Sequence, residues 1–130
     1  MENIELIKAA KKGMRNAYAP YSKFQVGAAV LTIKNNVYTG CNIENASFGA
    51  TNCAERTAIF KAISEGEREF AKIAVVSSSN DLTYPCGICR QVLGEFMPNG
   101  EVILVDKDDN IKIYKVEEFL PYRFILEDDK

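Results

Sequence analysis

The sequence contains no histidine among its 130 residues, and this absence removes several kinds of active site. Catalytic triads that depend on an imidazole are excluded, and so is every metal site that needs a histidine ligand. Any metal must therefore be held by thiolate or carboxylate groups, and proton transfer in a catalytic site falls to a carboxylate.

Long apolar runs are also missing, because no stretch approaches the roughly 18 consecutive apolar residues of a membrane span. The N-terminal residues Met1–Glu5 lack the basic start and the apolar run of a secretion signal. From the sequence we therefore expect a cytoplasmic protein with no membrane partner.

Neither sign of charge dominates, since the formal net charge is −2. This value argues against a nucleic acid polymer as partner, because such binding depends on Lys and Arg side chains that neutralise phosphates. The apolar fraction of 47% and the charged fraction of 26% are ordinary for a soluble globular protein. The length predicts a single domain over residues 1–130, and a small, weakly charged molecule is the expected substrate.

Four cysteines are present, and without an export signal they indicate metal ligands or buried thiols rather than disulfides. Three of them fall in two motifs, Cys53-Ala54-Glu55 and Pro85-Cys86-Gly87-Ile88-Cys89. Three thiolates at these spacings close three corners of a zinc tetrahedron, and a catalytic zinc site keeps the fourth corner open for water. Glu55 is placed to take a proton from that water, so the pattern predicts a hydrolytic zinc enzyme.

Each of these residues also has a less specific interpretation. The Cys86-x-x-Cys89 pair alone is typical of redox proteins as well, and Cys41, at the end of a predicted strand, would turn the site into a structural one if it were a fourth ligand. Asn52 and Glu55 have the spacing of a helix capping box. Arg56 is either a solvated residue or a donor to the sulfurs that offsets their negative charge, and Arg90 has the same two interpretations.

Hydrophobic periodicity and turn residues predict alternating helices and strands. Helices are expected at 4–17, 53–65, 87–97 and 116–120, and strands at 24–33, 37–41, 72–77, 101–106 and 111–114, with an irregular loop at 42–52. The short turns at 34–36 and 107–110 make both ends of the sheet antiparallel, while the order of the strands stays open. The expected fold is α/β, a three-layer α/β/α sandwich around a mixed five-stranded sheet.

Five segments together resemble the small homotetrameric class of cytidine deaminases. Two of them are the zinc motifs, Cys53–Ala58 and Pro85–Leu93, in the variant with three cysteines. The others are Ala19–Ala29, which is similar to the N-terminal substrate segment of the family, Gly40–Ser47, which is similar to its ribose-binding segment, and the C-terminal Leu120, Pro121 and Phe124.

The resemblance implies roles for particular residues. Cys53, Cys86 and Cys89 would hold one Zn²⁺ per subunit, Glu55 would transfer the protons, and Arg56 would support the ligands. Contacts with the substrate are implied for six further residues: Phe24, Asn42, Glu44, Ala54 through its backbone, Tyr84 through its carbonyl, and Phe124, which would enter the site of a neighbouring subunit.

The implied reaction is the hydrolysis of cytidine and 2′-deoxycytidine to the uridines with release of ammonia, in pyrimidine salvage. A blasticidin S deaminase and a non-catalytic zinc-stapled binding module are the alternatives. Three positions depart from the family pattern. Phe48 stands where tyrosine is frequent, Tyr84 replaces a small hydroxyl residue, and Tyr122-Arg123 is bulkier than the small pair usual before Phe124.

Overall fold

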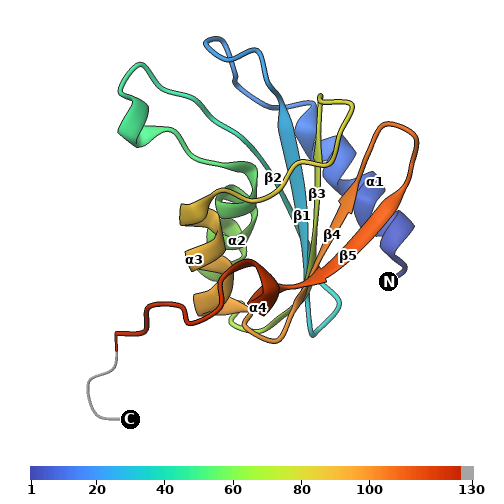
Figure 1. Ribbon diagram of the computed structural model, residues 1–130, viewed down its shortest axis with the longest axis vertical. Helices are drawn as coiled ribbons and strands as arrows, with labels where there is room; N and C mark the ends of the chain where they lie inside the picture. Colours follow the sequence, from blue (N-terminus) through green and yellow to red (C-terminus); the bar gives the residue numbers. More distant parts are fainter. Residues whose placement is uncertain (127–130) are drawn as a thin grey trace.

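Five strands form one mixed sheet in the computed structural model, which describes residues 1–126 (Figure 1). The strands are β1 (Val26–Thr32), β2 (Val37–Cys41), β3 (Phe70–Ser77), β4 (Glu101–Val105) and β5 (Ile111–Lys115), and they lie in the order β2-β1-β3-β4-β5. Only β3 and β4 run parallel, and both outer pairs are antiparallel. The predicted antiparallel ends are confirmed, and the order that the sequence left open is now defined.

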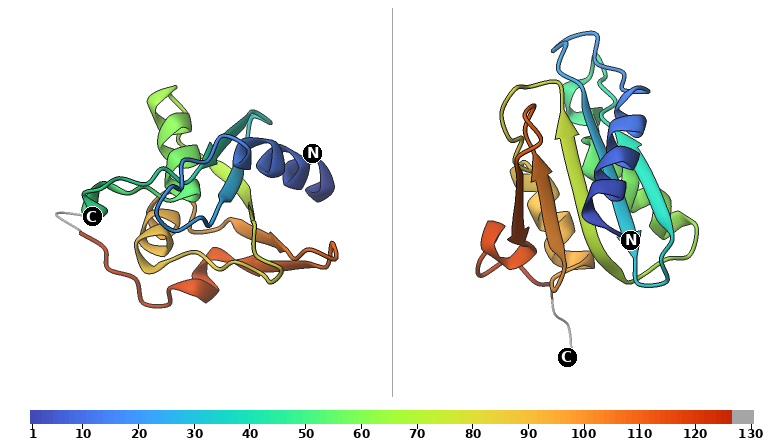
Figure 2. Two further views of the ribbon diagram at one scale, coloured as in Figure 1. Left: turned by 90° about the horizontal axis from the view of Figure 1, so that it is seen from above. Right: turned by 90° about the vertical axis from the view of Figure 1, so that its right-hand side faces the viewer.

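Helices cover both faces of this sheet. On one face lies α1 (Asn3–Met14), and on the other lie α2 (Ala54–Ser64) and α3 (Gly87–Phe96), as the views from above and from the side show (Figure 2). The short α4 (Val116–Phe119) follows β5 and contacts α3. The predicted three-layer α/β/α sandwich is therefore confirmed. Among residues 1–126, no helix combines the length and the apolarity that a membrane crossing requires.

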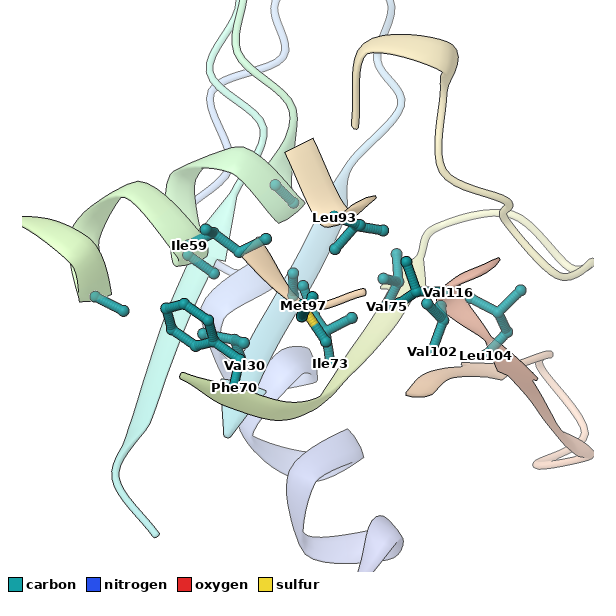
Figure 3. Close-up of a cluster of buried hydrophobic side chains, with 14 of the residues drawn as sticks. Val30, Ile59, Phe70, Ile73, Val75, Leu93, Met97, Val102, Leu104 and Val116 are labelled. Carbon is teal, nitrogen blue, oxygen red and sulfur yellow. The ribbon is translucent and has the colours of Figure 1, made fainter. Parts of the chain in front are cut away.

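Two apolar cores result from these three layers. The larger core lies between the sheet and the pair α2 and α3, where Ile59, Leu93 and Met97 pack over Val30, Ile73 and Val75 (Figure 3). The smaller core packs Leu6, Ile7 and Ala10 of α1 on the opposite face. All seven residues of β1 are buried because this strand is covered from both sides.

The first helix is shorter than the periodicity predicts. It ends at Met14 instead of Ala17, because the backbone of Tyr18 pairs with the segment 42–44: Tyr18 N–H donates to Asn42 O, and Glu44 N–H donates to Tyr18 O. The periodicity also assigns Ile4 to the buried side, yet this residue is 59% exposed. Pairing between distant segments, which no local pattern reports, thus decides where the helix ends.

The loop at 42–52 is more ordered than the sequence indicates. Ile43 and Asn52 exchange two backbone hydrogen bonds of 2.9 Å, and a single 3₁₀ turn, η1 (Phe48–Ala50), forms at the tip. The loop extends away from the sheet and ends at Cys53 (Figure 1). This backbone pairing brings the two arms of the loop together just before the start of α2.

The close approach of α2 to β2 depends on Gly40. A Cβ atom at this position would lie 2.5 Å from the carbonyl oxygen of Ala54 and 2.5 Å from the backbone nitrogen of Ala58. Both atoms belong to the backbone of α2 and cannot move independently of the helix. Only glycine therefore lets α2 rest directly on this edge strand.

We predict that Gly40→Ala lowers the free energy of unfolding by about 1–3 kcal/mol, because the added methyl group pushes α2 away from the sheet. Urea denaturation followed by circular dichroism measures this loss. Gly49→Ala is the matched control, since among the described residues no atom beyond Gly49 and its two chain neighbours lies within 4 Å of the place that its methyl group would occupy. Equal stability of the two variants would contradict the contact.

Candidate metal and catalytic site

Two helix N-termini bring the three motif cysteines together. Cys53 is the residue just before α2, Cys86 is the residue just before α3, and Cys89 lies in the first turn of α3. Their sulfur atoms all lie within 4.8 Å of one another. Because helix N-termini favour negative charge, this position favours the thiolate forms that bind metals.

The spacing of the sulfurs fits zinc better than a disulfide. The Sγ atoms of Cys53 and Cys86 are 3.6 Å apart. A tetrahedral site with Zn–S bonds of about 2.3 Å has S–S edges of about 3.8 Å, whereas a disulfide bond measures about 2.05 Å. All the cysteines are free thiols in the structure. The cluster is therefore positioned to hold a metal ion, and its soft ligands suit Zn²⁺.

Cys41 is separate from this group. It is buried at the end of β2, where burial raises the pKa of its thiol, and it is not among the residues whose ligand atoms gather within 4.8 Å. Within the described chain, the structure thus assembles three thiolates rather than four. A set of three protein ligands leaves one coordination position free, as in catalytic zinc sites.

Glu55 lies one residue inside α2 and is only 4% exposed. Burial raises the pKa of its carboxyl to about 7, and negative charge on Cys53 adds to the rise. A cation held by the three sulfurs would act in the opposite direction. The capping-box interpretation has no support, because no side chain caps α2 and the Asn52 amide instead donates to Thr57 Oγ1 at 3.0 Å.

Arg56 faces the sulfurs. Its Nη2 donates to Cys53 Sγ at 3.2 Å, and its Nε is buried with no hydrogen-bond partner in residues 1–126. The Cys89 thiol, donating to Cys53, and then the Arg56 guanidinium lower the pKa of Cys53 to about 5, although burial opposes them. The surroundings therefore stabilise negative charge on the Cys53 sulfur, whereas the hydrogen bond to Cys53 and burial raise the pKa of Cys89.

Arg90 takes a different role. Its Nε donates to Pro85 O at 2.8 Å, its Nη1 donates to Phe119 O at 3.2 Å, and its guanidinium lies over the Phe119 ring. These contacts tie the loop before Cys86 to α4. Arg90 thus fixes backbone around the site, whereas Arg56 contacts a ligand directly.

Asn42 and Glu44 both face the segment 21–26. Asn42 is buried; its Oδ1 accepts the N–H of Val26 at 2.9 Å, and its Nδ2 donates to Phe24 O at 2.7 Å. This leaves one N–H and one lone pair of its amide for another group. The residue therefore holds the backbone on either side of Gln25, next to Phe24.

Glu44 accepts three hydrogen bonds from the turn before Phe24. The donors are the Ser22 hydroxyl and the N–H groups of Tyr21 and Ser22, the latter two at 2.9 and 3.1 Å. The Ser22 hydroxyl, with these N–H groups, holds the pKa of Glu44 below its usual value. Sequence reasoning missed Ser22, because nothing in the local pattern relates it to a residue 22 positions away.

Phe24, Ala54 and Tyr84, the other residues predicted to contact the substrate, differ from one another in exposure and packing. Phe24 is 37% exposed and directly precedes Gln25 at the start of the sheet, and the fully buried Ala54 is the first residue of α2. The Tyr84 ring packs edge-on against Tyr114 and Phe119, with centroids 5.8 and 6.1 Å away. This packing explains how a large residue is accommodated just before the second motif.

Phe124 lies in the C-terminal segment, which leaves the body of the molecule beyond α3 (Figure 1). Its side chain is 69% exposed. The structure of the single chain therefore presents this ring to the outside.

The fold and the site together define a class, the α/β/α enzymes whose zinc site has three protein ligands and a neighbouring carboxylate. Comparison with known proteins narrows this class. Residues 1–106 match the family described as "Cytidine and deoxycytidylate deaminase zinc-binding region". The chain therefore belongs to the cytidine and deoxycytidylate deaminase family.

Relatives match over nearly the whole chain. A cytidine deaminase of Halalkalibacterium halodurans is 50% identical, with 98% of each chain covered. One from Sporosarcina psychrophila is 48% identical, with 98% of this chain and 95% of the relative covered. The crystal structure of the Burkholderia pseudomallei cytidine deaminase superposes with a TM-score of 0.92 at 47% identity and covers 95% of this chain and 100% of its own.

A relative named for a different activity is also similar to this chain, but at lower sequence identity. A blasticidin-S deaminase of Bacillus cereus is 27% identical over 95% of this chain and 92% of its own. The higher identity of the cytidine deaminases places the chain nearer to them.

We predict that the purified protein contains about one zinc per chain and that Cys53→Ala lowers this to less than about a tenth. Inductively coupled plasma mass spectrometry measures the metal. Cys41→Ala removes a cysteine outside the cluster and is expected to keep full zinc content. Loss of zinc in the Cys41 variant, or full occupancy in the Cys53 variant, would overturn the assignment.

Proposed function

We propose that the protein catalyses the hydrolytic deamination of cytidine and 2′-deoxycytidine, which yields uridine or 2′-deoxyuridine and ammonia. The observation that carries the proposal is the buried Glu55 carboxylate beside a cluster of three, not four, cysteine sulfurs. Cys53, Cys86 and Cys89 would be the zinc ligands. When bound, zinc supplies a Lewis acid that activates water as a nucleophile at neutral pH.

Glu55 carries the protons of the reaction. It accepts a proton from the attacking water and delivers it to N3 of the cytosine ring, which makes C4 electrophilic. After oxygen has added to C4, Glu55 takes the remaining proton from that oxygen and passes it to the exocyclic amino group. The C4–N bond then breaks, ammonia leaves and C4 becomes the carbonyl of uridine. One carboxylate can serve both transfers if its pKa lies near the working pH.

Arg56 counteracts an excess of negative charge. Three thiolates on a dication leave a net charge of −1, which weakens the metal as a Lewis acid. The donation from Arg56 Nη2 to Cys53 Sγ withdraws part of that charge. Arg56 therefore belongs to the proposed site although it contacts no substrate.

Recognition of the nucleoside is assigned to the segments around the metal cluster. Asn42 and Glu44 would bind the ribose hydroxyls, and Phe24 would pack against the base. The geometry supports this division, because Asn42 retains free hydrogen-bonding capacity and holds the backbone beside Phe24. A carboxylate has roughly four acceptor sites. Three of these sites on Glu44 already accept hydrogen bonds, so one remains for a hydroxyl.

The edge of the pyrimidine would meet backbone groups. Ala54 is the first residue of α2, and the first N–H groups of a helix have no partner within the helix. Tyr84 would contribute its carbonyl. Because its ring packs away with Tyr114 and Phe119, replacement of a smaller residue here is compatible with that role.

We further propose a homotetramer in the cytoplasm, with one deaminase domain over residues 1–130 per subunit and a role in pyrimidine salvage. Large apolar side chains that are exposed on the loop, on α3 and on the C-terminal segment support the assembly. Phe48 is 78%, Ile88 61%, Phe124 69% and Leu126 79% exposed. Burial of such residues favours assembly. Phe124 would complete the site of a neighbouring subunit.

We predict that Glu55→Gln reduces kcat for cytidine by about 10²–10⁴-fold while zinc stays bound, because the amide cannot accept and return a proton. The loss of absorbance on conversion to uridine reports the rate. Glu67→Gln is the matched control, since Glu67 is 8% exposed and its carboxylate bonds Asn36 and Tyr38. Normal turnover by the Glu55 variant would exclude the proposed role.

We also predict that mixing two inactive variants restores activity when their substitutions affect parts of the site that different subunits supply. Glu55→Gln subunits, refolded together with Phe124→Ala subunits, are expected to regain up to about a quarter of wild-type activity, because some sites combine an intact Glu55 with a partner's intact Phe124. Sedimentation equilibrium measures the subunit number. Glu55→Gln mixed with Cys53→Ala is the control and should stay inactive. Equal recovery in both mixtures would contradict shared sites.

A further inference from the structure

The carbonyl of Gly94 cannot be satisfied within its own helix. It lies in the last turn of α3, where the final four carbonyl groups lack the usual donors. The neighbouring Leu93 O still accepts Met97 N–H at 2.8 Å. The next donor along the chain would be residue 98, which is a proline and has no N–H.

Arg123 supplies the missing donor from another part of the chain. Its Nε donates to Gly94 O at 2.8 Å, across a separation of 29 residues. A cationic side chain at a helix C-terminus also interacts favourably with the helix dipole. Arg123 therefore closes the end of α3 in place of the N–H that Pro98 lacks.

The absence of a side chain at Gly94 makes room for this contact. A Cβ atom on Gly94 would lie 2.6 Å from Arg123 Cδ and 3.2 Å from its Nε. The stem of Arg123 thus lies directly over the helix backbone. Gly94 and Pro98 act together, since the first leaves space for the arginine and the second leaves a carbonyl free.

The residues on either side of Arg123 have distinctive backbone features. Tyr122 has a φ of 56°, the left-handed region that residues other than glycine rarely adopt, and its side chain is fully exposed. On the other side, Gln91 Nε2 donates to Phe124 O at 3.0 Å. Gln91 and Gly94 lie three positions apart, on one face of α3, the helix that follows Cys86 directly.

We propose that Arg123 is a positioning residue: by bonding Gly94 O, it fixes the C-terminal segment to α3 and sets the direction in which Phe124 leaves the subunit. The helix that carries Cys86 and Cys89 then also orients the ring offered to a neighbouring site. This inference rests on the proposed function, in which Phe124 contacts the substrate of that site.

Removal of Arg123 leaves Gln91 as the side-chain attachment of this segment to α3 among the described residues. The Phe124 ring then spends less time in the orientation that binds substrate, and the apparent affinity falls with that fraction. We expect Arg123→Ala to raise KM for cytidine about tenfold and to change kcat less than about twofold, because the reacting groups are untouched. Arg123→Lys, which keeps a cationic donor, should recover part of the lost affinity.

Arg68→Ala provides the matched control. Arg68 also caps a helix, since its Nη1 donates to Ile63 O near the end of α2 at 2.9 Å, but within residues 1–126 it forms no hydrogen bond with the C-terminal segment. Its loss should lower thermal stability with KM unchanged. An unchanged KM in Arg123→Ala, or the same KM increase in both variants, would overturn the proposal.

A double-mutant cycle tests whether Gly94 acts through Arg123. Gly94→Ala should raise KM in the wild-type background, because the new methyl group displaces the arginine. In the Arg123→Ala background the same change should have no further effect on KM and should raise the melting temperature, since alanine favours a helix. Additive effects on KM would refute a shared mechanism.

Amide hydrogen exchange separates this inference from the proposed function. Exchange of residues 121–126 should become faster in Arg123→Ala than in the wild type and stay unchanged in Arg68→Ala. If Arg123→Ala exchanges faster than the wild type but the wild type deaminates no cytidine, the proposed function is refuted while the attachment of the segment to α3 is supported. Exchange that is identical in all three proteins would refute the attachment itself.

Discussion

Three sulfur atoms must meet around one metal ion, and this requirement depends on where α2 and α3 begin. Because β1 runs antiparallel to both β2 and β3, and β3 runs parallel to β4, the strands β2, β3 and β4 all point the same way. Helix α2 connects β2 to β3, and α3 connects β3 to β4. Right-handed connections that proceed in one direction across a sheet place both helices on the same face. Both helices therefore start at the same edge, with Cys53 and Cys86 side by side.

The same edge concentrates charges that would be costly if they were buried alone. Glu55 is almost fully buried, and negative sulfur lies beside it, so each disfavours the other's charge. Arg56 and the two helix N-termini supply the compensating positive charge and N–H groups. A dication held by the three sulfurs would offset the negative charge that remains. Gathering these charges at one edge lowers local stability. The close contact of α2 with Gly40 and the large core beneath the helix offset that loss.

Around this rigid centre, the chain extends two less enclosed segments. The loop that carries Asn42, Glu44 and Phe48 is held by backbone pairing and by Ser22, and the C-terminal segment is held by Gln91 and Gly94 of α3. Each keeps its polar groups bonded within the subunit while it exposes an aromatic ring. The helices and strands thus hold the three cysteines and Glu55, whereas the extended segments leave large apolar side chains exposed.

Local patterns in the sequence were sufficient to predict which elements form and to identify three cysteines as candidate metal ligands. Cys86 and Cys89 share one helix turn whatever the fold, the short turns at 34–36 and 107–110 enforce hairpins, and the missing histidines leave thiolates as ligands. Tertiary structure alone decided the strand order, the early end of α1, the contact of Ser22 with Glu44, the packing of Tyr84 and the seat of Arg123 on Gly94. The physical reason is the separation of the interacting residues along the sequence. Spacing within a few residues is set by backbone geometry, whereas a contact between distant segments depends on how the whole apolar surface is buried and on which polar groups that burial leaves without partners.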